Sequence, residues 1–298
     1  MFYYWAYGLT IKSEMEFPEM LAHKGESIDV NIQLGPVPTT LAGEEITTKG
    51  SLSVSPTEYL LHLPICSYYV KDGNQITIDL KPHADDKSVR LFLLTNAMAA
   101  ILQQRNKVAL HAGAVVTDKG LIIISGDSGA GKSTSISALQ QKGYKVFADD
   151  VVVLEENPKA EVIAYASYPT IKLWEDSIEK LGVGELSEEA KLREHVSKYR
   201  VHFHEDFIRE PLPVTRVFVL KKNETLSAPS IKPLTGVQSF VDLYAQLYRT
   251  SQINSPEKRN LLFNSISNLA GKIPVHVIER PTEGNSIEEV LALIENAH

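Results

Sequence analysis

Residues 121–143, LIIISGDSGAGKSTSISALQQKG, constrain the fold more than any other part of this chain. An apolar run of strand length leads directly into a glycine-rich turn, and a segment with helical periodicity follows. Gly126 and Gly131 bracket four residues before Lys132 and Ser133, which matches the pattern G-x-x-x-x-G-K-[ST]. The stretch therefore predicts a strand, a tight loop and a helix in direct succession, as in an α/β protein.

This loop is predicted to bind the phosphates of a nucleotide. Its glycines let backbone N–H groups surround phosphate oxygens, while Lys132, expected to be exposed, reaches the β- and γ-phosphates and Ser133 binds Mg²⁺. The N-terminus of the following helix adds a partial positive charge. The alternative is a glycine-rich turn without a ligand. The residues expected at the nucleotide are Gly126, Asp127, Ser128, Gly129, Ala130, Gly131, Lys132, Ser133 and Thr134.

Charge and cysteine content exclude several classes of protein. The net charge of −7 argues against broad electrostatic binding to nucleic acid or to an anionic membrane, although a local basic patch remains open. Cys66 is the only cysteine, so an intrachain disulfide and a cysteine zinc cluster are excluded. No segment has eighteen uninterrupted apolar residues, and the N-terminus does not resemble a signal peptide. We expect a cytoplasmic protein. The sequence does not determine its oligomeric state.

The chain divides near residue 84. Residues 1–84 predict a β-rich N-terminal region, with alternation over residues 28–34 and a hairpin turn at residues 72–74. The aromatic residues at positions 2–7 fit a strand that packs on the core better than a ligand-stacking face. Residues 85–298 predict the domain that carries the loop, beginning with a long helix that has an acidic start.

Strands and helices alternate in the second part of the chain. For residues 172–182 and 187–200 the pattern allows two short helices or a partly ordered segment. Strands are expected at residues 108–116, 121–126, 144–150, 151–156, 162–167, 214–222 and 272–280, and helices at residues 132–142, 237–249, 257–270 and 286–297.

Two adjacent carboxylates, Asp149 and Asp150, end the strand that follows the loop helix. At least one should lie beside the metal and the γ-phosphate. One could hold Mg²⁺ while the other accepts a proton from an attacking hydroxyl. Successive strand side chains point to opposite faces, so both share a site only if the strand has ended or bulged there. The alternative is that one of them caps a turn.

Histidines give weaker signals. His111 precedes the loop by one hairpin, so its imidazole could face the phosphates or the aspartates, whereas a lone strand histidine is usually a hydrogen-bonded core residue. His202 and His204 would share one face of a strand, and His195 lies nearby in sequence. Because no third ligand has a recognisable spacing, a dedicated metal site is not predicted.

The succession HAGAV, LIIISGDSGAGKST and GYKVFADDVVVL resembles the catalytic domain of the HPr kinase/phosphorylase family over residues 108–155. The resemblance is weaker to about residue 220 and absent from the N-terminal region. The segment is also similar to phosphoenolpyruvate carboxykinase, which shares the nucleotide-binding core, but the short spacing favours the kinase. The resemblance implies an α/β fold with a P-loop kinase core. It also implies that Asp149 is the base for a protein serine hydroxyl, Asp150 binds Mg²⁺ and His111 tunes the base. The roles of the two aspartates could be reversed.

Two further segments, SYPTIKLWEDSIEKLG and KYRVHF, look like a shorter subgroup that includes the lasso-peptide precursor kinases. These modify a serine of a small peptide, typically its C-terminal residue. Lys172 stands where related sequences often carry arginine. Lys198 and Arg200 are candidates for neutralising the transferring phosphoryl group or an acidic peptide end, and the alternative is a solvated surface. Residues 187–210 are a candidate flap over the acceptor.

The hypothesis from the sequence is an ATP-dependent, Mg²⁺-dependent serine kinase whose partner is a peptide or small protein. Reversal by phosphate is not expected, because the chain lacks the family's regulatory N-terminal domain and the segment associated with phosphorylase activity. A small-metabolite kinase would need a closed pocket beside Asp149, and a nucleotide-dependent switch would need no second aspartate. The acceptor and the choice between ATP and GTP remain open.

Overall fold

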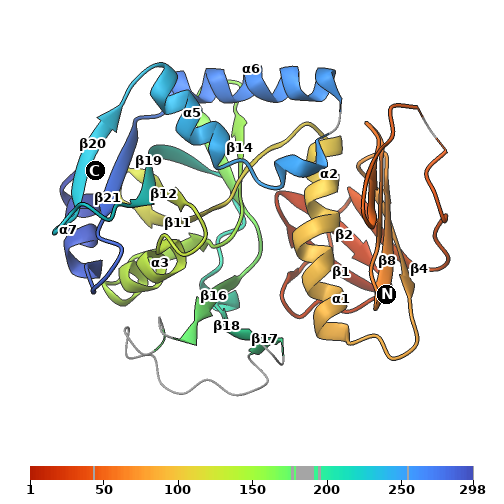
Figure 1. The fold of residues 1–298 in the computed structure, drawn as a ribbon. Helices are drawn as coiled ribbons and strands as arrows, with labels where there is room; N and C mark the ends of the chain where they lie inside the picture. Colours follow the sequence, from red (N-terminus) through yellow and green to blue (C-terminus); the bar gives the residue numbers. More distant parts are fainter. Residues whose placement is uncertain (43, 176–177, 179–190, 194–195, 254, 298) are drawn as a thin grey trace.

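The computed structural model describes residues 1–298 except residues 43, 176–177, 179–190, 194–195, 254 and 298. An N-terminal sheet lies at one side of the molecule, and a second sheet with its own helices lies at the other (Figure 1). A helical segment runs between the two (Figure 1). The fold is thus a mixed α/β arrangement built on large mixed sheets.

The N-terminal sheet confirms the predicted β-rich region. Its strand order is β3-β1-β2-β4-β9-β8-β7-β6-β5, and the β8–β9 pair closes the hairpin predicted at residues 72–74. Tyr4, Trp5 and Tyr7 are buried, which confirms that the first strand packs on a core. Its strands are β1 (Phe2–Ala6), β2 (Leu9–Ser13), β3 (Leu21–Ala22), β4 (Val30–Leu34), β5 (Thr47–Lys49), β6 (Leu52–Val54), β7 (Glu58–His62), β8 (Cys66–Lys71) and β9 (Gln75–Leu80).

The long helix expected after residue 84 forms in three sections, α1 (Asp86–Phe92), the π-helical turn η1 (Leu93–Ala97) and α2 (Met98–Gln104). Asp85 caps its start, since its carboxylate accepts a hydrogen bond from the backbone N–H of Ser88 at 2.9 Å. In this wider turn, a tyrosine hydroxyl provides a hydrogen bond to a backbone carbonyl: the hydroxyl of Tyr7 donates to Leu94 O at 2.8 Å. The helix shares its hydrophobic core with the N-terminal sheet.

In the second sheet the strand order is β10-β14-β15-β19-β12-β11-β13, with β21 pairing β19 and β20 pairing β21. Strands β12, β19 and β21 are parallel, so their carboxyl ends meet at one edge. The strands are β10 (Val108–Leu110), β11 (Ala112–Thr117), β12 (Gly120–Gly126), β13 (Lys145–Ala148), β14 (Val152–Glu156), β15 (Val162–Ala166), β19 (Leu212–Lys222), β20 (Ser230–Leu234) and β21 (Val275–Arg280).

Helices cover both faces of this sheet. Along β19, Val217 and Val219 face the core of α5 and α6, whereas Phe218 and Leu220 face the core of α3 and α7. Among the described residues, no helix has both the length and the apolarity needed to cross a membrane. The remaining elements are α3 (Lys132–Gln141), α5 (Val237–Ala245), α6 (Pro256–Lys272), α7 (Ile287–Ala297) and the 3-10 turns η3 (His204–Asp206) and η4 (Thr250–Gln252).

A small third sheet corrects the expectation of short helices for residues 172–200. It contains β16 (Thr170–Trp174), β17 (Lys191–Arg193) and β18 (Val196–His202), in the order β16-β18-β17. Ile171 and Leu173 are buried at a spacing of two residues, which is the period of a strand. His195, most of residues 176–190, and the side chain of Lys198 lie outside the described residues, as does much of the candidate flap.

One buried carboxylate joins the N-terminal region to this third sheet. Glu19, 1% exposed, accepts a hydrogen bond from Arg90 Nε of α1 at 3.0 Å and one from Arg200 Nη1 of β18 at 2.9 Å. Arg200, predicted near the transferring phosphoryl group, instead has its guanidinium on this carboxylate, where both charges are paired out of water.

Replacing Glu19 with Gln should lower the free energy of unfolding by about 3 kcal/mol, because the buried Arg200 and the partly buried Arg90 lose their counter-charge. Urea unfolding measures the effect. Asp79→Asn is the matched control, since its ion pair with Lys81 is half-exposed, far more so than the pair at Glu19, and should contribute less than about 1 kcal/mol. Equal losses for the two variants would contradict the prediction.

Candidate functional site

The glycine-rich loop lies at the edge where the parallel strands end. Gly126, the last residue of β12, has a φ of 141°, and a Cβ there would collide with the backbone carbonyl of Leu220 on β19. Gly131 has a φ of 109° and directly precedes α3. Glycine at both positions lets the chain leave the sheet closely and enter the helix with its N–H groups facing the loop.

Two buried side chains hold this loop. Lys132 is 7% exposed, which corrects the expectation of an exposed lysine. Its Nζ donates to the carbonyls of Gly126 at 2.7 Å and Asp127 at 3.1 Å, so the ammonium bridges the two sides of the loop. From the end of α5, Gln246 Oε1 accepts a hydrogen bond from Gly126 N at 2.9 Å.

The two aspartates share the site because the strand has ended before them. Strand β13 stops at Ala148, and Asp150 has a left-handed φ of 72°. Asp149, 1% exposed, accepts a hydrogen bond from Ser133 Oγ at 3.0 Å and one from the backbone N–H of Lys172 at 2.9 Å. Its carboxylate and the Ser133 hydroxyl are two oxygen donors that converge, as a Mg²⁺ site requires.

Asp150 faces a different set of partners. Lys172 Nζ lies 2.5 Å from its Oδ2, and His111 Nδ1 lies 3.5 Å from its Oδ1. His111 stands at the break between β10 and β11, and its Nδ1 lies 2.9 Å from the backbone carbonyl of Asp150. Because a carbonyl can only accept, Nδ1 carries the hydrogen and Nε2 of the neutral ring is an acceptor.

The electrostatic surroundings keep Lys172 charged and His111 neutral. Burial acts to lower the pKa of Lys172, but the charge and hydrogen bond of Asp150, together with Tyr248 and Asp149, outweigh it and raise this pKa above its ordinary value. Burial lowers the pKa of His111, and the charge of Asp150 opposes that shift only in part.

Two cavities meet at this point. The first, about 500 Å³, is lined by the loop, both aspartates, Lys222, Arg280, and residues 284–287 and 290 at and just before the start of α7. The second, about 520 Å³, is lined by parts of α1, η1, Lys172 and residues 245–249. Both volumes suit small-molecule ligands. His111, Ser128 and Asp150 line both cavities, whereas Asp149 lines only the first.

Two cations that the sequence analysis missed stand beside the loop. Lys222 and Arg280 end β19 and β21 and are register partners in that parallel pair. Arg280 donates from Nε to Ala130 O at 2.8 Å and from Nη2 to Gly129 O at 3.3 Å. The available signal was positional, since each residue ends an expected strand, and ligands bind at the carboxyl ends of parallel strands. Gln246 and Arg249 were also missed, and no local pattern marks them.

The structure thus gathers the predicted loop residues with Asp149, Asp150, His111 and Lys172, but it does not bring Arg200 to either cavity. His202 Nδ1 lies 2.9 Å from the hydroxyl of Thr170, and its ring contacts that of His204. Within the described residues, no cluster of three His, Cys, Asp or Glu side chains could hold a metal ion.

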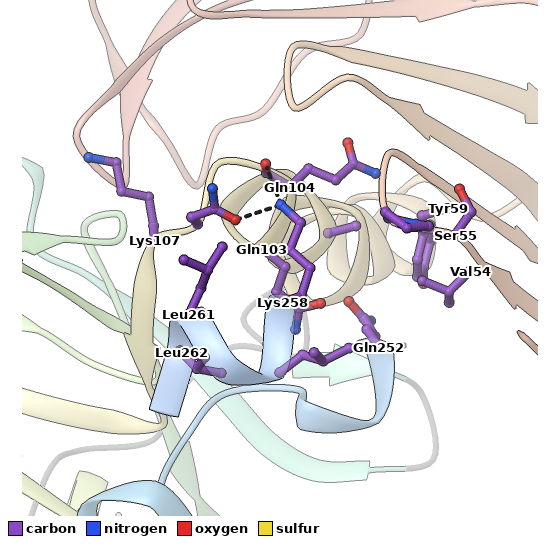
Figure 2. Close-up of a pocket in the computed structure, with 14 residues that line it drawn as sticks. Val54, Ser55, Tyr59, Gln103, Gln104, Lys107, Gln252, Lys258, Leu261 and Leu262 are labelled. Atoms are coloured by element: carbon purple, nitrogen blue, oxygen red, sulfur yellow. Dashed lines mark hydrogen bonds between the residues drawn. The ribbon is translucent and has the colours of Figure 1, made fainter. Parts of the chain in front are cut away.

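A third, smaller cavity lies away from the loop, between α2, α6 and the N-terminal sheet (Figure 2). Tyr59, Gln252 and Lys258 line it, and Lys258 Nζ donates to Asn106 Oδ1 at 2.5 Å. Its volume of about 50 Å³ has room for a few water molecules, far below the roughly 300 Å³ of organic ligand sites. It is therefore not the site of a nucleotide.

Comparison with known proteins gives a distant likeness. No family model matches the chain. The chain is similar to the solved structure of the HPr(Ser) kinase/phosphatase from Coxiella burnetii, at 16% sequence identity and a TM-score of 0.34, over 63% of this chain and 89% of that one. A likeness of this size assigns no role to any residue.

Stability should fall as the pH decreases from about 7.5 to 5.5, because the pKa values of His111, His202 and His276 are lowered, chiefly by burial. The unfolded chain takes up these protons at a higher pH than the folded chain, so acid favours unfolding. Urea unfolding of wild type and His111→Gln measures this effect, and the variant should show the weaker pH dependence. An unchanged dependence would contradict the prediction.

Proposed function

We propose that this protein is a Mg²⁺-dependent phosphotransferase that moves the γ-phosphoryl group of ATP to a hydroxyl group. The observation that carries the proposal is the pair of cavities meeting at His111 and Asp150, one of them built on the glycine-rich loop. A transferase needs two substrates in contact at one point, and its catalytic power comes mainly from positioning and charge neutralisation.

The first cavity takes the nucleotide. Backbone N–H groups of the loop and of the first turn of α3 surround the phosphates, and the Lys132 ammonium exchanges its loop carbonyls for phosphate oxygens. Lys222 and Arg280 add positive charge from the neighbouring strand ends. These groups offset the charge that develops on the leaving diphosphate.

The metal belongs with Ser133 and Asp149, whose oxygens lie 3.0 Å apart. Both are hard oxygen donors, and Mg²⁺ in phosphotransferases is held by few protein ligands together with phosphates and water. When bound there, Mg²⁺ neutralises charge on the β- and γ-phosphates. This assignment exchanges the roles of metal ligand and base that the sequence resemblance implied for the two aspartates.

Asp150 then serves as the base for the acceptor, since it lines both cavities. The acceptor oxygen forms a bond to the γ-phosphorus, the bond to the bridging β–γ oxygen breaks, and ADP leaves. Asp150 receives the hydroxyl proton. Lys172 holds its carboxylate, and His111 fixes its backbone carbonyl, so both act as positioning residues.

The acceptor we propose is a serine of a peptide or small protein, and the sequence resemblance extends this to the C-terminal serine of a lasso-peptide precursor. A small-metabolite kinase is the alternative, because a cavity of about 520 Å³ also suits a small acceptor. The second cavity favours either of these over a nucleotide-dependent switch, which needs no acceptor site.

The test is to incubate the protein with Mg-ATP and either a serine-terminated peptide or a panel of hydroxy metabolites, and to measure a mass gain of one phosphate. Lys132→Ala should abolish transfer, because the phosphates lose a buried cation. Lys142→Ala, which removes an exposed lysine after α3, is the matched control and should keep full activity.

Transfer should also stop in excess EDTA. Phosphorylation of a metabolite with no peptide modified would favour the small-molecule alternative. Absence of nucleotide binding by folded wild-type protein would sink the proposed function.

Substitutions of the two aspartates should have different effects on nucleotide binding and on the rate of transfer. Asp150→Asn should keep nucleotide binding and slow transfer by about 10²- to 10⁴-fold, since an amide cannot accept the proton. Asp149→Asn should instead raise the Mg²⁺ concentration required for nucleotide binding. Measuring the transfer rate of both variants as a function of Mg²⁺ concentration decides which aspartate is the base and which binds the metal. Rescue of Asp150→Asn by added Mg²⁺, with no rescue of Asp149→Asn, would restore the order implied by the sequence.

A further inference from the structure

The second cavity has a wall that comes from the helical segment between the two large sheets. Leu91 and Phe92 of α1 and Thr95 and Asn96 of η1 line it, facing a cavity that also contains Asp150. This wall is fixed, because the hydroxyl of Tyr248 donates to Thr95 O at 3.1 Å across the cavity lining. The acceptor side of the molecule thus includes helices that pack on the N-terminal sheet.

Arg249 lies on this lining in a strained backbone conformation. Its φ of 55° and ψ of 42° are left-handed, as is the φ of 72° at Asp150 in the same cavity. Two contacts hold its carbonyl, a hydrogen bond from Gln103 Nε2 at 2.9 Å and one from Gln252 N at 3.0 Å. Strain at non-glycine residues persists where surrounding contacts impose it, and such residues cluster at functional sites.

The guanidinium of Arg249 is held over an aromatic ring without a counter-charge. It lies 5.7 Å from the centroid of Tyr248, and among the described residues no carboxylate lies within ion-pair distance of it. The other charged side chains that line the cavity are Asp127, Asp150 and Lys172, of which the last two pair with each other. An arginine so placed presents a fork of donors that fits a carboxylate.

We propose that Arg249 binds a carboxylate of the acceptor while the acceptor hydroxyl lies at Asp150. The inference rests on the proposed function and names the acceptor class, a hydroxyl compound that also carries a carboxylate. In a peptide this group is the chain end or an acidic side chain, and in a hydroxy acid it is the molecule's own carboxylate. The apolar side chains of Leu91 and Phe92 pack against the rest of the acceptor.

The experiment measures transfer from Mg-ATP by the full chain to three probes. The first is a peptide that ends in serine with a free carboxylate and has no other acidic group, the second is the same peptide as its C-terminal amide, and the third is N-acetylserine. For wild type, the amide should have a KM higher than the acid by about 10- to 100-fold, the effect of losing a charged hydrogen bond.

Three substitutions separate charge from backbone. Arg249→Ala and Arg249→Gly should both raise the KM for the acid probes by that factor, remove the difference between acid and amide, and leave the KM for ATP unchanged. Glycine adopts the left-handed backbone without strain, so agreement of the two variants assigns the effect to the guanidinium. Arg249→Lys should be intermediate. Arg259→Ala, an arginine of α6 that lines neither cavity, should behave as wild type.

Equal use of acid and amide by wild type, or an acid preference that survives in Arg249→Ala, would overturn the inference. So would transfer confined to hydroxyl compounds without a carboxylate. Nucleotide binding, measured with a fluorescent ATP analogue in the absence of acceptor, distinguishes failure of the proposed function from failure of the role given to Arg249. If wild type does not bind it, the proposed function fails, whereas binding with unchanged acceptor kinetics in Arg249→Ala rejects only the role of Arg249.

Discussion

The reversal of the chain at Asp149 and Asp150 is the constraint on which the arrangement of the site depends. A continued strand would send one carboxylate to each face of the sheet. Instead the backbone turns left-handed at Asp150, and both carbonyls are held, that of Asp149 by the Ser167 hydroxyl at 3.2 Å and that of Asp150 by His111. Asp149 therefore stays with the loop serine, while Asp150 faces Lys172 and the second cavity.

The sequence predicted the parts of this site whose signals are local. The strand, loop and helix around Gly126 and Lys132 follow from hydrophobic periodicity and glycine spacing, and the structure forms them at residues 120–141. The aspartates were predicted because they end a strand. Lys222, Arg280 and Gln246 were missed because their positions depend on pairing between strands and helices far apart in the chain, which no local pattern encodes.

The expectations that failed also depended on tertiary contacts. Residues 191–193 and 196–200 carry enough charge to resemble exposed helices, but β18 pairs with β16 and β17 pairs with β18, so both segments are strands. Arg200 is the register partner of Lys172 in the pair of β16 and β18. Its side chain points to a carboxylate in the N-terminal region, and nothing in the sequence around Arg200 identifies Glu19 as its partner.

This ion pair also limits how far the molecule is modular. Glu19 belongs to the N-terminal region, yet it neutralises an arginine on the strand that pairs with β16, and β16 carries the lysine that holds Asp150. A chain cut near residue 84 would lack Glu19 and would leave Arg200 buried without its counter-charge. Arg200 lies in the small sheet that carries Lys172, so the loss would act on the sheet that positions the site. The two regions therefore depend on each other for stability, although their sheets are separate.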